Sequence, residues 1–435
     1  MTDFQTTDFQ QRALTLAGQQ QSPAWLAALR FEGSEQWLNA DWPGRRTELW
    51  KYTPLQALQK STSAGWSSAL PQGAGSAALL TIDAIRLVFV NGVFDAKAST
   101  ANHDSVVRFS NANDAQRSLI EKHLGRIVDT KRHLFASLSN AWVQDGVLVH
   151  VPRNVVLEKP VYVVHVSTPE AEPVIANQRL LIVLEDNSQA ELIEHFASDA
   201  RTQNSFVNAL TEVSIAANSS LQHYRINLEQ EAQIHIGGVH IDLQRDSRYS
   251  GFTIAEGSAL KRIDYQINHR GNGAYASLNG VYLPRNNQLV DYHTNVEHWA
   301  PHCTTSEIFR GIIGDSARAV FNGRILIHPD AQKTLAELSN RNLLTSDKAE
   351  VDTKPELEIY ADDVKCAHGA TVSQLDQTAM YYLQSRGVSK TQARTMLSFG
   401  FINELLQDLP QPAVRDYLQH HLTVLFGMDT GTGLS

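Results

Sequence analysis

From Gly146 to Ser373 the apolar positions fall in short runs, continuous or alternating with polar residues, and Asn, Asp, Gly, Ser and Pro separate the runs. This pattern is typical of many short β-strands. The predicted strands include Val147–Val151, Val161–Val166, Leu180–Leu184, Ile234–Ile241 and Leu357–Tyr360. No helical pattern of ten or more residues interrupts them before Ser373, which disfavours a parallel sheet with helical crossovers.

A weak internal repeat divides the strand-rich region. Two-residue turn signals begin at residues 187, 218, 257, 286 and 315, so successive starts are 31, 39, 29 and 29 residues apart. Six residues after each start the side chain is large and apolar, namely Ile193, Tyr224, Ile263, Tyr292 and Phe321. The third position holds Ala190, Leu221, Leu260 and Leu289 and fails at Arg318. Inward apolar positions at fixed offsets favour a stacked solenoid, and a β-sandwich with evenly spaced turns is the alternative.

The region before residue 141 is predicted to be helical and mixed. Apolar spacing indicates helices over Gln10–Leu29 and Asn113–Ser139. Between them, Ser61–Ala78 is rich in Ser, Gly and Ala and is expected to be a loop. The run Ile85–Val90 is followed by Asn91-Gly92, which predicts a β-hairpin.

Helical signals return after Thr371. Asp376 is a cap for a helix over Gln377–Arg386 with Gly387 as its stop, and Ser389 with Gln392 resembles a capping box for a helix reaching Leu409. A third helix is expected over Pro412–Phe426. The domains are therefore set at 1–140, 141–372 and 373–435. The apolar residues of the last domain exceed what a short terminal bundle buries alone, so it packs on the solenoid or meets another protein.

Composition limits which partners the protein can bind and in which compartment it is expected. The formal charge is −9 with acids and bases interspersed, so no basic field exists to hold a nucleic acid. No basic patch precedes an apolar run at the N-terminus, and no stretch approaches the roughly 18 apolar residues of a membrane span. A cytoplasmic location is expected. The two cysteines, Cys303 and Cys366, exclude a disulfide framework.

The sharpest candidate for chemistry is the stretch from Asp362 to Gly369. In an extended strand, Cys366 and His368 share a face, and Asp362 joins them if no bulge intervenes. A thiolate beside an imidazole binds iron or zinc, but two ligands do not fill a tetrahedral site. A metal held here needs ligands from a partner or substrate. The alternative is a buried Cys beside a hydrogen-bonded His.

A second cluster offers several ligand types within thirteen residues: Asp291, His293, Glu297, His298, His302 and Cys303. The spacing is not that of a zinc knuckle, and Pro301 prevents a helix that would align His298 with His302. A hydrogen-bonded rung or a subunit interface is therefore preferred over a self-contained metal site. The sequence has no GxxxxGK[ST], HExxH, GxSxG or CxxC motif, so an independent ATPase, hydrolase or complete cluster site is hard to build.

Several strings resemble the SufB/SufD family of iron–sulfur cluster assembly proteins. They are Glu48–Leu55, which contains WKYTP, and Asp291–Thr294, Arg318–Gly323, Ala349–Pro355, Glu358–Val372 and Tyr382–Gly387. Together they span about residues 45 to 406. The stretch Cys366–Thr371 follows the SufD branch, because the SufB branch reads more like Glu-His-Glu-Ala-Thr there. Ser373 departs from the Gly that is frequent in the family. Trp50, Tyr52 and Pro54 of the first string are expected to be packing residues.

The resemblance implies a mainly β fold, a right-handed parallel β-helix flanked by N- and C-terminal helical regions. It also implies a non-catalytic scaffold that pairs with SufB edge to edge and docks the SufC ATPase through its C-terminal helices, where Met396, Phe399 and Phe401 are candidate contacts. ATP-driven closure of two SufC copies would strain the junction. There, Cys366, His368 and Asp362 would serve cluster assembly, with metal ligation by Cys366 and His368 completed by the partner.

In this picture no cofactor is held stably by the chain alone. A transient iron–sulfur cluster forms on the complex, and a reduced flavin (FADH2) is compatible with it. A homodimer is expected when SufB is missing, and a purely structural homodimeric solenoid is an alternative function. A carbohydrate-active solenoid enzyme is a third, but it needs a row of carboxylates and Arg along one face that is not evident in the sequence.

Overall fold

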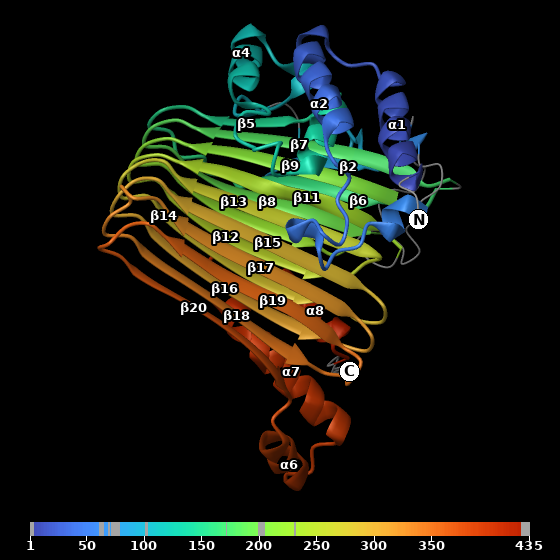
Figure 1. The fold of residues 1–435 in the computed structure, drawn as a ribbon, viewed down its shortest axis with the longest axis vertical. Coiled ribbons are helices and arrows are strands. Elements are labelled where there is room, and N and C mark those ends of the chain that lie inside the picture. The colour runs from blue at the N-terminus through green and yellow to red at the C-terminus, as the bar shows by residue number, and fades with distance from the viewer. Residues whose placement is uncertain are drawn as a thin grey trace.

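The protein is a parallel β-solenoid in which the chain winds between two facing sheets (Figure 1). This computed structural model describes residues 4–60, 65–67, 70, 79–100, 103–170, 172–198, 205–229 and 232–427. Sheet A runs in the order β19-β17-β15-β13-β11-β9-β7-β5-β4, with β1 paired to β7, and sheet B in the order β20-β18-β16-β14-β12-β10-β8-β6-β2-β3. Every pairing is parallel except β2 with β3 and β4 with β5.

The strands of sheet A are β1 (Gly65–Trp66), β4 (Val106–Arg108), β5 (Val147–Val151), β7 (Val174–Leu184), β9 (Ser205–Ile215), β11 (Ile234–Leu243), β13 (Leu260–His269), β15 (Leu289–His298), β17 (Arg318–Ile327) and β19 (Glu350–Ile359). The strands of sheet B are β2 (Ile85–Val90), β3 (Val93–Phe94), β6 (Val161–Ser167), β8 (Gln189–Ser198), β10 (Ser220–Asn227), β12 (Arg248–Glu256), β14 (Tyr275–Leu283), β16 (Thr304–Ile313), β18 (Leu335–Leu344) and β20 (Lys365–Gln374). The helices are α1 (Phe4–Gly18), α2 (Ala27–Asn39), α3 (Gln56–Lys60), α4 (Asp114–His123), α5 (Leu134–Ala141), α6 (Gln377–Ser385), α7 (Lys390–Gln407) and α8 (Pro412–Leu425). Short 3-10 turns lie at Ala24–Leu26, Glu48–Trp50 and Phe109–Asn111.

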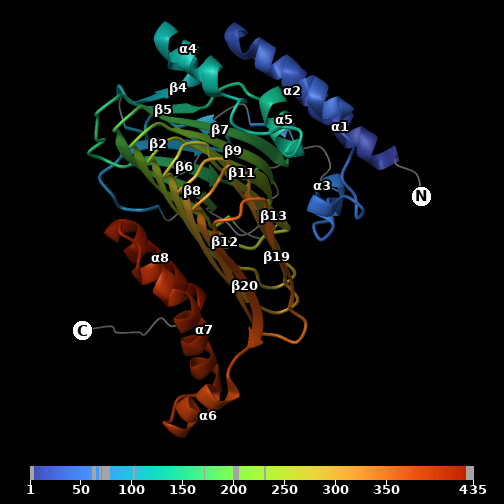
Figure 2. The ribbon, with the colours of Figure 1, turned by 60° about the vertical axis from the view of Figure 1, so that its left-hand side comes forward.

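Both faces of each sheet are buried over much of their area. Inward side chains from the two sheets, such as Leu278, Phe309 and Phe321, form one continuous core along the solenoid. The outer face of sheet A packs against N-terminal residues including Trp37 and Phe135, and the outer face of sheet B packs against helices α7 and α8. Figure 2 shows these two helical layers on opposite sides of the strands.

Because both faces of each sheet are buried, the inward positions predicted from the repeat are only partly correct. The turns at Asn187 and Asn218 lead into sheet B, whereas those at 257, 286 and 315 lead into sheet A. The 39-residue interval is longer because it joins the last turn that leads into sheet B to the first that leads into sheet A. Ile193 and Tyr224 point outward to the C-terminal helices, and Leu260 and Leu289 point outward to the N-terminal region. The expectation that these four point inward is wrong.

The predicted N-terminal helices are each broken once. Gln10–Leu29 is divided between α1 and α2, since Gly18 ends the first helix and Pro23 precedes the next turn. Asn113–Ser139 is divided between α4, where Asn113 makes a capping box, and α5, because Gly125 follows α4 with a φ of +72°. The loop expected over Ser61–Ala78 lies mostly outside the described residues. The hairpin at Asn91-Gly92 is confirmed, with φ values of +48° and +83°.

The predicted C-terminal helices and their caps are confirmed. Asp376 caps α6, Gly387 has a φ of +87°, and Ser389 with Gln392 forms a capping box at the start of α7. Among the described helices, none is long and apolar enough to span a membrane.

The interior leaves no room for a side chain at Gly311 in β16. A Cβ there would lie 2.1 Å from the Tyr282 ring. That ring is buried, and its hydroxyl is fixed because it donates to Asn342 at 2.5 Å and accepts from Asn340 at 2.9 Å. We expect Gly311→Ala to destabilise the protein by about 1–3 kcal/mol and to lower the thermal midpoint.

Gly369 in β20 is the matched control, because a Cβ there meets nothing within 4 Å. Gly369→Ala should change the free energy of unfolding by less than about 0.5 kcal/mol. Equal midpoints for the two variants would contradict the packing described for the interior.

Candidate functional site

The solenoid ends in two strands whose outer edges are unpaired. Within the described residues, β19 pairs only with β17 and β20 only with β18. These strands form the open end of the solenoid, where the next rung would otherwise cover both backbone edges and inward side chains. All but one of the residues of β20 are exposed. The open end is therefore a surface on which another strand can pair.

Cys366 and His368 lie on one face of β20, as their spacing predicts. Cys366 is in register with Ala336 and His368 with Leu338, both of which belong to the interior core. The two side chains thus continue the inner face of the solenoid, where Cys366 is half-buried and His368 is exposed. Burial raises the pKa of the Cys366 thiol, so a metal or a cationic neighbour is needed to favour its thiolate.

Asp362 lies outside the strand that carries Cys366 and His368. It lies in an exposed bend, and β20 begins only at Lys365. The bend is held by Asp363, whose side chain pairs with Lys333 and whose backbone N–H donates to Gln332 at 2.9 Å. The strand alternation on which the placement of Asp362 relied therefore stops short of it.

The C-terminal module, helices α6 to α8, is anchored on sheet B and continues past the open end (Figures 1 and 2). Phe399 and Phe401 are partly buried against the core that these helices share with sheet B, and Arg310 donates to the Phe401 carbonyl at 2.7 Å. Met396 is 49% exposed. Phe399 and Phe401 thus have a packing role, while Met396 is available to a partner, together with Tyr381 and Tyr382 on α6.

The WKYTP segment is fixed to sheet A by a buried ion network. Arg262 lies over the Trp50 ring at 3.9 Å and pairs with Asp264 and Asp291, each at 3.1 Å. Thr53 donates to the same Asp291 at 2.5 Å. Trp50 is buried, in agreement with a packing role; Tyr52 is half-buried, and Pro54 is exposed.

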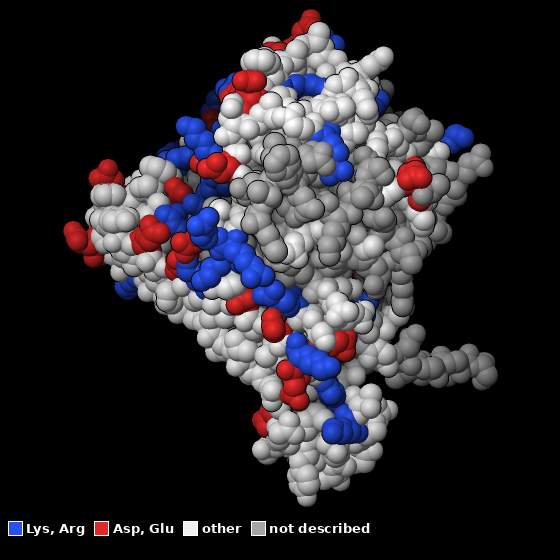
Figure 3. All heavy atoms as spheres, turned by 45° about the vertical axis from the view of Figure 1, so that its right-hand side comes forward, with Lys and Arg blue, Asp and Glu red and all other residues white. Residues whose placement is uncertain are grey.

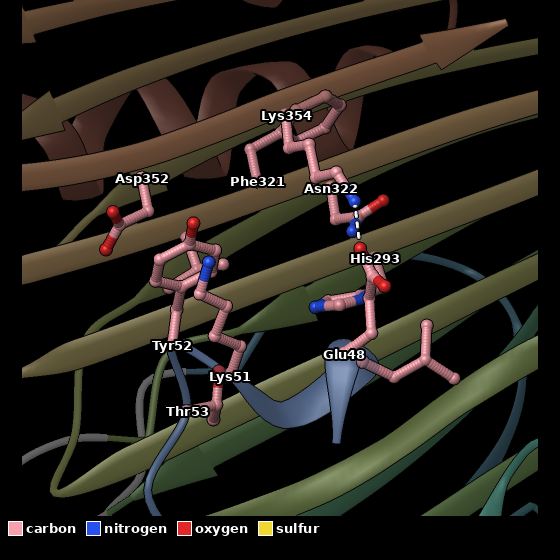
Figure 4. Close-up of a pocket in the computed structure, with 11 residues that line it drawn as sticks. Glu48, Lys51, Tyr52, Thr53, His293, Phe321, Asn322, Asp352 and Lys354 are labelled. Carbon is pink, nitrogen blue, oxygen red and sulfur yellow. Dashed lines mark hydrogen bonds and ion pairs between the residues drawn. The ribbon is translucent and has the colours of Figure 1, made fainter. Parts of the chain in front are cut away.

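A small cavity of about 80 Å³ lies between this segment and sheet A (Figure 4). Lys354 and Glu48 meet across it at 2.5 Å, and His293 lies beneath them, 3.0 Å from Asp291. Ligand pockets usually measure about 300 Å³ or more. The cavity is therefore too small for a cofactor, and Asp291 and His293 act here as structural groups.

On the face shown in Figure 3, Lys and Arg side chains form an oblique band, and Asp and Glu side chains lie along its margins. Arg324 pairs with Glu358 at 2.7 Å and Arg318 with Glu350 at 3.0 Å, so ion pairs bridge the last strands of sheet A. Such pairs align neighbouring strands and contribute little stability when exposed.

Sequence reasoning missed two interior groups, His269 and Glu307. His269 is in register with His298, 29 residues later. The 29-residue repeat could therefore have predicted that these two histidines lie on neighbouring rungs. Glu307 lies on β16 between Leu278 and Leu338 in the interior. Neither of its carboxyl oxygens has a hydrogen bond of ordinary geometry within the described residues. Burial raises the pKa of Glu307 to about 8, and the Thr294 hydroxyl offsets only part of this.

Fold and site together define a parallel β-solenoid with a thiol and an imidazole on an unpaired end strand. Comparisons with known proteins agree with this class. The family described as "SUF system FeS cluster assembly, SufBD core domain" matches residues 165–401, and "SufBD protein N-terminal region" matches residues 6–163. The chain belongs to the SufBD family of iron–sulfur cluster assembly proteins.

Individual relatives lie in the same family. The chain is 33% identical to the iron-sulfur cluster assembly protein SufD of Escherichia coli (strain K12), over 86% of this chain and 87% of the relative. It is 30% identical to a SufBD family protein of Synechocystis, over 87% and 86%, and 30% identical to SufD of Bacillus subtilis, over 69% of each chain.

The isolated carboxyl of Glu307 makes stability depend on pH. The folded state keeps a proton that the unfolded chain releases, so the contribution of Glu307 is fully present below its ordinary pKa and is lost as pH rises to about 8. Glu307→Gln should unfold at a higher temperature than the parent at pH 9. The two midpoints should converge near about pH 5. Glu337→Gln, on the exposed face of β18, should follow the parent at every pH. Parallel curves for Glu307→Gln and the parent would disprove this account.

Proposed function

We propose that this chain is a SufD-type scaffold subunit that supplies half of a cluster-assembly site to a SufB-type partner. The observation that carries the proposal is the position of Cys366 and His368, side by side on the open end of the solenoid. Biological iron–sulfur clusters generally take about four protein ligands. Two ligands on an unpaired strand are incomplete until another chain adds its own.

The backbone of the open end supports edge-to-edge pairing. Strands β19 and β20 each leave one row of N–H and C=O groups unpaired among the described residues. A partner solenoid with matching edge strands satisfies those groups and covers the half-buried Cys366 at the same time. Pairing and completion of the site are then one event. The chain itself needs no catalytic turnover, and the cluster and its iron are cargo of the complex, where FADH2 is a candidate reductant.

The C-terminal module supports docking of a SufC-type ATPase. Its inner face is occupied by sheet B, and its outer face keeps Tyr381, Tyr382 and Met396 exposed. The module projects past the open end in both ribbon views, next to the proposed junction (Figures 1 and 2). Movement of an ATPase bound there would reach β20 through the short connection Leu375-Asp376.

A homodimer through the same edges is the second candidate assembly. The open end that fits a SufB-type partner also presents two free edges to a second copy of this chain. Mixing experiments separate the two, because a heterologous partner with its own ligands should displace the second copy and a purely structural homodimer should not exchange.

His368→Ala should lower the iron and sulfide bound by the complex co-expressed with SufB and SufC and purified without oxygen. The imidazole is exposed, so its loss leaves folding and assembly intact. Loss of a hydrogen-bond partner of a metal ligand already weakens a metal site by about 10–100-fold, and loss of the ligand itself should cost at least as much. Iron and sulfide per complex should fall well below half of the parent value.

Thr371→Ala is the matched control, since Thr371 is exposed on the other face of the same strand. It should retain the parent content of iron and sulfide. Undiminished content in His368→Ala, with the complex assembled, would remove His368 from the site.

Met396→Glu should weaken retention of SufC by the tagged chain, because a carboxylate replaces an exposed apolar contact on α7. Its thermal midpoint should stay within about 2 °C of the parent, as expected for a surface change. Thr391→Glu adds the same charge to another exposed face of α7 and should leave retention unchanged. Equal retention by both variants would place the docking surface elsewhere.

A further inference from the structure

Three side chains of types that can bind metal ions meet in the interior, and all three lie far from β20 in the sequence. His269 ends β13, His298 ends β15, and Cys303 lies immediately before β16. One ligand atom from each lies within 4.8 Å of the others, and all three residues are buried. His269 and His298 are in register on neighbouring rungs, and their rings stack 4.2 Å apart at 7°.

The two imidazoles share a single hydroxyl. Nε2 of His269 lies 2.8 Å from Thr305 Oγ1, and Nε2 of His298 lies 3.0 Å from the same oxygen. A hydroxyl has one proton to donate and two lone pairs that accept. Without a metal, therefore, Thr305 donates to one ring and accepts from the other.

This arrangement leaves the other side of each ring unsatisfied. Nδ1 of His269 and Nδ1 of His298 make no hydrogen bond of ordinary geometry within the described part of the chain. The Ala274 carbonyl is close enough to His269 to raise its pKa slightly, but nothing equivalent acts on His298. Buried polar atoms without partners are rare and need an explanation.

We propose that His269, His298 and Cys303 bind one late first-row divalent metal ion, such as Zn²⁺ or Fe²⁺. The ligands are Nδ1 of each imidazole and Sγ of the thiolate, and binding releases the thiol proton to solvent. Both Nε2–H groups then donate to Thr305 Oγ1, whose two lone pairs accept them. Thr305 then holds the orientation of both imidazoles, as hydrogen-bond partners of metal-bound histidines usually do.

The protonation states of the three side chains suit this chemistry. Burial lowers the pKa of His298 to about 3 and that of His269 as well, so both rings are neutral and have a lone pair to give. Burial raises the pKa of Cys303 to about 11, and a bound metal removes that proton outright.

The three ligand atoms must move closer together to bind one ion. Zinc ligands lie about 2.0–2.3 Å from the ion, so neighbouring tetrahedral ligands are roughly 3.4–3.8 Å apart. One ligand atom from each residue lies within 4.8 Å of the others. A bound metal lies near the plane of each imidazole, so the two stacked rings must rotate relative to one another to share one ion. The fourth position is left for an exogenous ligand. The corner segment from Trp299 to Cys303 contains two of the exposed residues nearest the site in sequence, Trp299 and His302.

The site is independent of the proposed role of β20, and cobalt can test it on the full-length chain. The chain has only two cysteines, so a thiolate-to-cobalt charge-transfer band in Cys366→Ser can come only from Cys303. With Co²⁺ alone, anaerobically, the parent and Cys366→Ser should each bind one ion and show this band. Cys303→Ser should lose the part of the band that Cys366→Ser retains, and His298→Gln made in the Cys366→Ser background should bind at least tenfold more weakly.

His302→Ala is the control, since His302 is an exposed histidine in the same corner segment. It should bind Co²⁺ as the parent does. Absence of the band from folded Cys366→Ser overturns the proposal. This result does not depend on whether the Cys303 and His298 variants fold. Unchanged cobalt affinity on adding His298→Gln to Cys366→Ser overturns it too. Neither outcome affects the proposed scaffold function, which depends on His368 and the complex.

Discussion

The structure depends on one constraint: each rung of a solenoid is covered only by its neighbours. Backbone hydrogen bonds and inward side chains are satisfied along the axis, rung by rung, until the last one. At β19 and β20 the ladder stops while its edges and part of its inner face remain uncovered. The site with Cys366 and His368 follows from that incompleteness, because the same residues one rung earlier would be enclosed, as Ala336 and Leu338 are.

The other surfaces of the solenoid are covered by the chain itself. N-terminal helices cover sheet A and C-terminal helices cover sheet B (Figure 2). Two buried ion pairs of sheet A, Arg262 with Asp291 and Arg179 with Glu212, also hydrogen-bond to the N-terminal region. Thr53 donates to Asp291, and the Gly125 N–H donates to Glu212. Ion pairs of this kind add little net stability, because desolvation offsets their attraction, but losing one partner is costly. They therefore favour a single placement of the N-terminal segment on sheet A.

Local chemistry in the sequence predicted the local features well. Caps at Asp376 and Ser389, the hairpin at Asn91-Gly92 and the strand face shared by Cys366 and His368 need only neighbouring residues. Features that depend on contacts between residues far apart in the sequence were harder to predict. Both sheet faces are buried, so apolar residues such as Ile193 and Tyr224 could not be assigned inward or outward from hydrophobicity. His269 lies one full rung from His298, outside any local window, and the bend at Asp362 depends on Lys333 of the previous rung.

The central claim is that the open end meets another chain, and amide hydrogen exchange tests it most directly. The comparison is between the lone chain, diluted until monomeric, and the co-purified complex with SufB and SufC. The account predicts strong slowing of exchange over Lys365–Gln374 and Glu350–Ile359 in the complex, with little change in the interior strand Leu260–His269. Equal exchange at β19 and β20 in both samples would contradict it.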